Sequence, residues 1–212
     1  MVDHVFHEGN FGAICKGLAQ GDEDLKKIMD SYGYPQMWTR PNSFATLVLI
    51  ILEQQVSLQS AYAAYNKLSQ KIKKITPQNL LQLTEEELRQ CYFSRQKIGY
   101  VRGLATALTS QSLDLKKMAL LPDDAIRTEL VSLKGIGDWT VDIYLLHAMQ
   151  RLDVFPLGDL ALVKAIKEIK GLTHATKEEL IDIGDRWRPH RSIATMMLWH
   201  YYLQKRGIQI IH

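Results

Sequence analysis

Signals that begin helices recur along almost the whole chain, and they constrain the fold more than any other feature. Residues 42–52 open with capping side chains and stay apolar on nearly every face, as a buried helix does. Thr76 precedes a proline and Thr84 precedes three glutamates, which are two further helix starts. After Ser94, apolar residues recur at the helical spacing 98, 101, 104, 105 and 108. Because period-two alternation and tight Asn-Gly turns are lacking, the sequence predicts an all-α fold.

The size and composition of the chain are those of an ordinary globular protein. The 212 residues suit one domain or two closely associated lobes, and the 46% hydrophobic share allows a real core. The longest apolar run, residues 47–52, is far short of the ~20 residues that span a bilayer. A disordered chain and a membrane bundle are therefore excluded. Further helices are expected at 57–74, 121–133, 139–149, 160–169 and 191–204.

Charge and cysteine content narrow the partners and the compartment. Lys and Arg number 26 against 23 Asp and Glu, and the formal net charge of +3 permits an anionic partner without indicating one. Two cysteines, Cys15 and Cys91, are too few for a disulfide framework or a four-cysteine metal site. Residues 1–9 mix charged and apolar side chains, unlike a secretory signal. A reducing, intracellular compartment is therefore expected.

Two glycines separated by one apolar residue, Gly135-Ile136-Gly137, lie between two expected helices. Glycine permits the positive φ of a tight hairpin, which we expect of both Gly135 and Gly137, while Ile136 can fill the core. The first N–H groups of the following helix have no intrahelical partner and suit a phosphate. An ordinary interhelical turn explains the same residues, but the flanking helices favour a helix-hairpin-helix.

Asp159 follows an extended stretch, residues 153–158, and directly precedes an expected helix. It is therefore a suitable N-cap, and that role alone explains an aspartate here. The second interpretation is chemical, because the helix dipole and backbone donors keep such a carboxylate ionised. A fixed negative charge can stabilise a developing cation or orient a water molecule. From the residues alone, the cap is favoured over catalysis.

Two polar segments carry weaker signals. Residues 186–192 (Arg-Trp-Arg-Pro-His-Arg-Ser) precede the last expected helix. Their arginines can contact phosphates, but anchoring the loop to acidic groups such as Asp182 and Asp185 is the favoured interpretation. Gln54 and Gln55 follow the apolar helix directly, and they are either solvated or available to probe bases.

Taken together and in order, these segments resemble the helix-hairpin-helix-Gly/Pro-Asp DNA glycosylases, and most closely the 3-methyladenine DNA glycosylase II type. The order and spacing match from about Phe44 to Tyr201. Five motifs in order are a specific signal, whereas any one of them alone is weak. The segments that carry the resemblance are residues 51–57, 93–105, 133–140, 153–159 and 186–194.

The resemblance implies two helical lobes with a central DNA-binding cleft. Residues 1–40 would join 151–212 in a terminal lobe, and residues 41–150 would form a central lobe that contains the hairpin. The partner would be damaged double-stranded DNA, whose target nucleotide is flipped into the cleft because a duplex hides the glycosidic bond. Asp159 takes the position of the catalytic aspartate, which would stabilise an oxocarbenium-like sugar and orient the attacking water.

The resemblance also implies a pocket for the flipped base. Trp139 and Trp199 take pocket positions, where an electron-rich indole attracts a cationic alkylated purine by ~0.5–2 kcal/mol per contact. Some relatives place an aromatic residue at position 143, which is Ile143 here. For the other tryptophans, Trp38 and Trp187, core filling is the favoured interpretation.

The residues that the resemblance assigns to DNA binding are Lys134, Gly135, Gly137, Gln54 and Gln55. The two glutamines match the segment that fills the hole left by the flipped base, where some relatives carry a bulky apolar wedge at the position of Gln55. The hairpin in this superfamily commonly holds a monovalent cation, Na⁺ or K⁺, on backbone carbonyls. These carbonyls match Val131, Leu133 and Ile136.

Two absences refine the expected activity. Lyase branches carry a Schiff-base lysine two residues beyond the second hairpin glycine, where this chain has Trp139. Two cysteines also cannot ligate the four-cysteine iron–sulfur cluster of some relatives. A monofunctional hydrolase of alkylated purines in base excision repair is therefore expected, with no required cofactor. The enzyme would be a monomer that does not bind membranes. It would act in the cytoplasm of a bacterium or in the nucleus of a eukaryote. The alternative is a non-catalytic helix-hairpin-helix DNA-binding protein in which Asp159 is only a cap.

Overall fold

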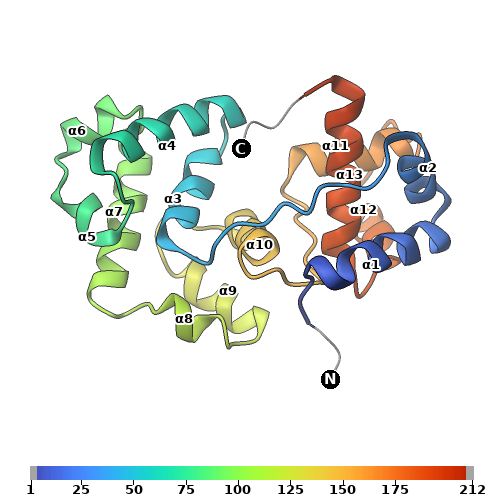
Figure 1. Ribbon diagram of the computed structural model, residues 1–212, viewed down its shortest axis with the longest axis horizontal. Helices are drawn as coiled ribbons and strands as arrows, with labels where there is room; N and C mark the ends of the chain where they lie inside the picture. The colour runs from blue at the N-terminus through green and yellow to red at the C-terminus, as the bar shows by residue number, and fades with distance from the viewer. Residues whose placement is uncertain (1–3, 209–212) are drawn as a thin grey trace. The chain divides into compact units, whose positions relative to one another are not determined.

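A computed structural model describes residues 4–208, and within that range the chain forms thirteen helices and no strand (Figure 1). One isolated bridge in this range pairs Val5 with Arg151. The all-α prediction is confirmed. The helices are α1 (Glu8–Gly21), α2 (Glu23–Tyr32), α3 (Phe44–Glu53), α4 (Leu58–Ile72), α5 (Pro77–Gln82), α6 (Glu85–Gln90), α7 (Arg95–Thr109), α8 (Leu115–Met118), α9 (Asp123–Val131), α10 (Asp138–His147), α11 (Leu160–Ile169), α12 (Lys177–Asp185) and α13 (Arg191–Arg206).

Two compact units make up the chain. One contains the residues up to Thr39 and those from Leu145 onward, and the other spans Arg40–Tyr144. In the Arg40–Tyr144 unit, α3 packs against α4 and α7, and α7 also packs against α5 and α6. Nearly every residue of α3 is buried, as its apolar sequence predicts.

The last residue of α3, Glu53, is a buried carboxylate and therefore needs a partner. Arg40 supplies one, because its Nη1 and Nη2 donate to the two carboxylate oxygens at 2.9 and 2.6 Å. Such a bidentate pair fixes both direction and distance. The pair therefore holds the end of α3, from which Gln54 and Gln55 continue.

In the other unit, α13 packs against α1, α2 and α11, and Figure 1 shows it beside α11. The first turns of α13 are buried and hold the extended stretch before Asp159. The Ser192 hydroxyl donates to the Arg151 carbonyl at 2.6 Å and accepts from the Val154 N–H at 3.0 Å. The start of α11 is thus positioned by the start of α13.

Four helices, α1, α2, α8 and α12, lie outside the predicted ones. Four glycines lower the helix propensity of α1, whose N-cap is the unusual His7. For α2 and α12, by contrast, the sequence contains ordinary helix-start signals. Asp22 caps α2, and Thr176 with Glu179 forms a capping box at the start of α12.

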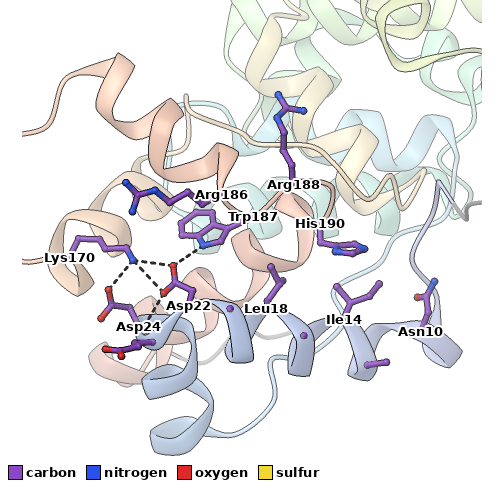
Figure 2. Close-up of a pocket in the computed structure, with 14 residues that line it drawn as sticks. Asn10, Ile14, Leu18, Asp22, Asp24, Lys170, Arg186, Trp187, Arg188 and His190 are labelled. Carbon is purple, nitrogen blue, oxygen red and sulfur yellow. Dashed lines mark hydrogen bonds and ion pairs between the residues drawn. The ribbon is translucent and has the colours of Figure 1, made fainter.

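Asp22 also joins the start of α2 to distant parts of its unit (Figure 2). Besides capping α2, its carboxylate accepts from Trp187 Nε1 at 3.0 Å and from Lys170 Nζ at 3.1 Å. Burial raises the pKa of this carboxyl, but the hydrogen bonds and the Lys170 charge outweigh burial, so the pKa lies below its usual value. Trp187 is 2% exposed and is a core residue, as predicted.

The free energy of unfolding should therefore depend on Asp22 in a defined pH window. A carboxyl whose pKa is lower in the folded state stabilises the fold above its unfolded pKa of about 3.9, and this stabilisation is lost as the pH falls through the folded pKa. We expect Asp22→Asn to cost about 1–2 kcal/mol at pH 7 and to flatten the loss of stability that wild type shows as the pH falls below about 4. Urea titrations across this range measure both effects. Asp30→Asn, at an exposed position of α2, is the control, and an unchanged pH profile in Asp22→Asn would contradict the prediction.

Candidate active site

The Gly-Ile-Gly segment forms the turn between α9, which ends at Val131, and α10, which begins at Asp138. The Ile136 N–H donates to the Leu133 carbonyl at 3.1 Å and closes the turn. The Ile136 side chain is 4% exposed, so its predicted place in the core is confirmed. The two helices and this turn form a helix-hairpin-helix.

The two glycines of the turn differ in what they require. Gly135 has a φ of +91°, and a Cβ added there would lie 2.1 Å from the Tyr100 ring. Gly137 has no positive φ, so the expectation that both glycines need one is wrong for Gly137. Its carbonyl already accepts the Val141 N–H in the manner of a helix start. A Cβ on Gly137 would meet no described atom within 4 Å, which leaves room for a ligand to approach the backbone.

Gln54 connects the end of α3 to this turn. Its Nε2 donates to the Gly135 carbonyl and to the Thr140 hydroxyl, both at 2.9 Å. An amide nitrogen has two N–H groups, so both are used within the protein. Contact of the Gln54 side chain with DNA therefore stays a prediction, while the structure gives that side chain the task of joining the segment after α3 to the hairpin.

Lys97 supports the same segment from α7. Its Nζ donates to the carbonyls of Leu52 and Gln54 at 2.7 and 3.0 Å, which satisfies acceptors at the end of α3. Burial lowers the pKa of Lys97. The next residue, Gln55, is exposed and has a φ of +57°, which few residues other than glycine adopt. Gln55 is therefore presented at the surface by a segment fixed at both Lys97 and the hairpin.

Asp159 lies directly before α11 and caps it, as predicted. Its Oδ1 accepts from the Leu162 N–H at 2.7 Å and from Trp199 Nε1 at 3.0 Å. The carboxylate thus stands at the positive end of the helix dipole with a backbone donor and an indole donor on one oxygen. The side chain of the neighbouring Leu160 is 76% exposed, so solvent reaches the first residue of α11.

The structure brings Trp199 to Asp159, and it adds a residue that the sequence did not single out. His147, in the last turn of α10, stacks on Trp199 with ring centroids 5.4 Å apart and an interplanar angle of 12°. A lone histidine after an apolar segment carries no sequence signal for such a contact. Trp139 is half-buried in the first turn of α10 and belongs to the Arg40–Tyr144 unit.

Residues 48–189, more than half of the chain, match the HhH-GPD superfamily of base excision DNA repair proteins. The chain belongs to this superfamily. A solved structure of DNA-3-methyladenine glycosidase from Bacillus halodurans is 30% identical, with a TM-score of 0.77 over 92% of this chain and 91% of that one. The Schizosaccharomyces pombe 3-methyladenine DNA glycosylase, solved in complex with abasic DNA, is 25% identical, with a TM-score of 0.79 over 88% and 95% of the two chains. The predicted resemblance is confirmed.

Curated HhH-GPD relatives differ in how much of their length this chain covers. DNA-3-methyladenine glycosylase 1 from S. pombe is 27% identical over 188 residues, which are 86% of this chain and 82% of the relative. Two Bacillus subtilis relatives are longer, and the chain spans only 43% of the first and 64% of the second. The likeness to the S. pombe relative therefore covers most of both chains, whereas the two B. subtilis relatives contain further sequence.

Two arginines near the start of α13, Arg188 and Arg191, form ion pairs within their own unit. Arg188 donates to Asp153 at 2.6 Å and to Asp185 at 2.8 Å. Arg191 donates to Asp153 at 2.7 Å and to Asp185 at 3.3 Å. The anchoring interpretation is confirmed for Arg188 and Arg191 at Asp185, but the second partner of both arginines is Asp153, not the expected Asp182.

Other parts of the molecule offer weaker candidate sites. A groove of about 670 Å³ between α1 and residues 186–190 includes neither Asp159 nor Trp199 (Figure 2). Within residues 4–208, no group of three or more His, Cys, Asp or Glu side chains is placed to hold a metal ion. No helix in this range is long and apolar enough to cross a membrane.

Proposed function

We propose that this chain is a monofunctional DNA glycosylase that hydrolyses the N-glycosidic bond of alkylated purines such as 3-methyladenine in damaged double-stranded DNA during base excision repair. The observation that carries the proposal is the carboxylate of Asp159. It lies at the start of α11 and is held by the Leu162 N–H and by the indole N–H of Trp199. A simple helix cap needs the first donor and not the second. The names of the similar proteins support the substrate class.

The chemistry needs a negative charge where the deoxyribose becomes cationic. As the bond between C1′ and the base nitrogen breaks, positive charge develops on the sugar, and an ionised Asp159 beside it lowers the barrier. A water molecule attacks C1′ and gives a proton to the carboxylate. A purine methylated at N3 or N7 is already cationic, so it takes the bonding electron pair and leaves as a neutral base. No general acid is required on the base.

Trp199 and Trp139 are the proposed base-contacting residues, because an indole face attracts a cationic purine more than a neutral one. Ile143 is 4% exposed, so α10 offers a buried aliphatic side chain at the position where some relatives carry an aromatic ring. This difference affects the range of bases that the pocket accepts. The preference for cationic over neutral bases is the part of the proposal that the tryptophans support.

The hairpin residues Lys134, Gly135 and Gly137 are the proposed phosphate-binding turn. Lys134 is exposed, and the backbone at Gly137 can be approached without meeting a described atom. Contacts of this kind position the duplex and carry no sequence information. Gln55 is the proposed tip that fills the gap left by the flipped nucleotide, with Gln54 holding that tip to the turn.

Gly137→Val tests the phosphate-binding turn, because a Cβ at this position meets no described atom within 4 Å and we expect the variant to fold. We expect it to weaken binding to undamaged duplex about tenfold, the cost of one lost charge-assisted contact. Fluorescence anisotropy with two unrelated flanking sequences measures the effect, which should be equal for both. Trp199→Ala, in contrast, should leave undamaged-duplex affinity unchanged and lower base excision. Unaltered affinity in a folded Gly137→Val protein would show that the turn does not bind DNA.

A monovalent cation, Na⁺ or K⁺, is the proposed occupant of the carbonyls of Val131, Leu133 and Ile136. Val131 is the last residue of α9, and Leu133 and Ile136 come shortly after it, so the three carbonyls lie near the helix C-terminus, where partial negative charge suits a cation. The Leu133 carbonyl already accepts the Ile136 N–H, but a carbonyl oxygen has a second lone pair. The cation would stiffen the turn, and the proposal requires no other cofactor.

Base release from DNA methylated by a simple alkylating agent tests the proposed reaction. Chromatography should detect free 3-methyladenine with the wild-type protein and only background without it.

A second experiment tests whether the enzyme also cuts the strand. Because Trp139 stands where lyases carry their lysine, borohydride added during turnover should trap no protein–DNA adduct, and the strand should stay intact until alkali is added. A trapped adduct would contradict the monofunctional assignment. DNA binding without any base release would favour the alternative, a non-catalytic helix-hairpin-helix protein. The proposed enzyme acts as a monomer in the compartment that holds the DNA.

A further inference from the structure

Trp199 is held at two places on its ring. Its edge donates from Nε1 to Asp159 Oδ1 at 3.0 Å, and one face is covered by the His147 ring at an interplanar angle of 12°. A centroid separation of 5.4 Å between nearly parallel rings is that of an offset stack. The indole is therefore fixed both in its plane and in its rotation.

His147 is itself fixed from the side of the protein backbone. It is 8% exposed, and its Nδ1 lies 2.8 Å from the carbonyl oxygen of Trp38. A carbonyl oxygen can only accept, so Nδ1 carries the proton and donates it. Trp38, His147, Asp159 and Trp199 all belong to the same compact unit.

These contacts form one continuous path from the backbone at Trp38, through the imidazole and the indole, to the carboxylate of Asp159. We propose that His147 is a positioning residue for the glycosylase reaction, which orients Asp159 by holding Trp199. The inference rests on the proposed function of Asp159. In this role His147 acts through Trp199: it fixes the indole N–H that, with the Leu162 N–H, sets the direction of the carboxylate.

The stack also decides which face of Trp199 can receive a base. A ring that lies parallel on one side of the indole excludes a second ring from that side. A flipped purine therefore stacks on the opposite face. In the absence of the imidazole, the indole could be approached from both faces, and its N–H would no longer be held toward Asp159.

The test compares two abasic-site analogues in otherwise identical duplexes. One carries a protonated pyrrolidine ring, which resembles the cationic sugar of the transition state, and the other carries a neutral tetrahydrofuran ring. The ratio of the two dissociation constants reports how well Asp159 is aimed at the sugar. Both duplexes compete for the same folded protein, so any loss of folded protein cancels in the ratio.

We expect wild type to prefer the cationic analogue and His147→Ala to reduce that preference about tenfold, which is ~1.4 kcal/mol. His147→Phe keeps a ring on Trp199 and should retain the preference within about threefold. Trp199→Phe keeps a ring but loses the N–H donor, so it should lose the preference, and adding His147→Ala to it should cost nothing further.

His200→Ala is the matched control. His200 is also 8% exposed, and its Nε2 lies 3.0 Å from the Tyr32 carbonyl, but its ring packs edge-on against Tyr32 and not on Trp199. This control should lower thermal stability as His147→Ala does while keeping the wild-type ratio. An unchanged ratio in His147→Ala, or an equal loss in His147→Phe, would overturn the inference. If wild type and Asp159→Asn show the same ratio, the proposed role of Asp159 itself has failed.

Discussion

Asp159→Asn should lower the single-turnover rate of 3-methyladenine release by at least ~100-fold while leaving the fold intact, because it removes the charge that stabilises the cationic sugar. Asparagine keeps an oxygen at the position of Oδ1, which can still accept from the Leu162 N–H and from Trp199 Nε1. Asparagine is also as good an N-cap as aspartate. The variant therefore separates the charge of the side chain from its structural role.

Two further variants serve as controls for the effect of the charge and for the effect of the cap. Asp159→Ala removes both charge and cap, so it should lose the same activity and in addition about 1 kcal/mol of stability. Asp182→Asn removes a charge from an exposed position of α12 and should change neither quantity. Rapid-quench measurement of base release, with thermal unfolding of each protein, gives both values. A rate near wild type in a stable Asp159→Asn protein would leave Asp159 as a helix cap only.

The features that the sequence predicted are those encoded within a few neighbouring residues. Ser43 and Thr84 cap the helices that follow them, and Asp159 caps α11, because a cap needs only a side-chain oxygen and the N–H groups two or three residues later. The buried α3 and the place of Ile136 in the core follow from local apolar spacing in the same way. Such signals do not depend on the rest of the chain.

The features that sequence reasoning missed are long-range contacts of polar side chains. The amide of Gln54 finds Gly135, which lies 81 positions away, and the imidazole of His147 finds a backbone carbonyl 109 positions away. A glutamine or histidine has several satisfactory partners, so only the packed structure selects one of them. The sequence alone also cannot select a partner for the arginines of residues 186–192, because a guanidinium binds a phosphate and a carboxylate equally well.

Gly137 illustrates how a correct motif can carry an incorrect physical reason. The pattern of two glycines predicted the turn, but positive φ was expected of both, and only Gly135 has it. Neither the backbone conformation at position 137 nor the packing of the protein around it requires a glycine there. What remains is the space in front of its backbone, which matters only when another molecule occupies it.

The two glycines should therefore respond very differently to one added methyl group. In Gly135→Ala, the Cβ would sit 2.1 Å from the Tyr100 ring, and the alanine would be held at a φ of +91°. Backbone strain of ~1–3 kcal/mol and overpacking of similar size predict a loss of roughly 3 kcal/mol in the free energy of unfolding. Gly137→Ala places the same methyl group in open space and should change stability by less than ~0.5 kcal/mol.

Denaturant unfolding of both variants measures this difference, and a third protein separates its two causes. Tyr100→Ala added to Gly135→Ala removes the ring that the methyl group strikes but leaves φ positive, so it should recover only the overpacking part of the loss relative to Tyr100→Ala alone. Because Gln54 donates to the Gly135 carbonyl, a displaced turn should also release the segment that presents Gln55. Gly135→Ala should consequently weaken duplex binding even at temperatures where it is fully folded. Equal stability of Gly135→Ala and Gly137→Ala would mean that the turn adopts a different backbone conformation in solution.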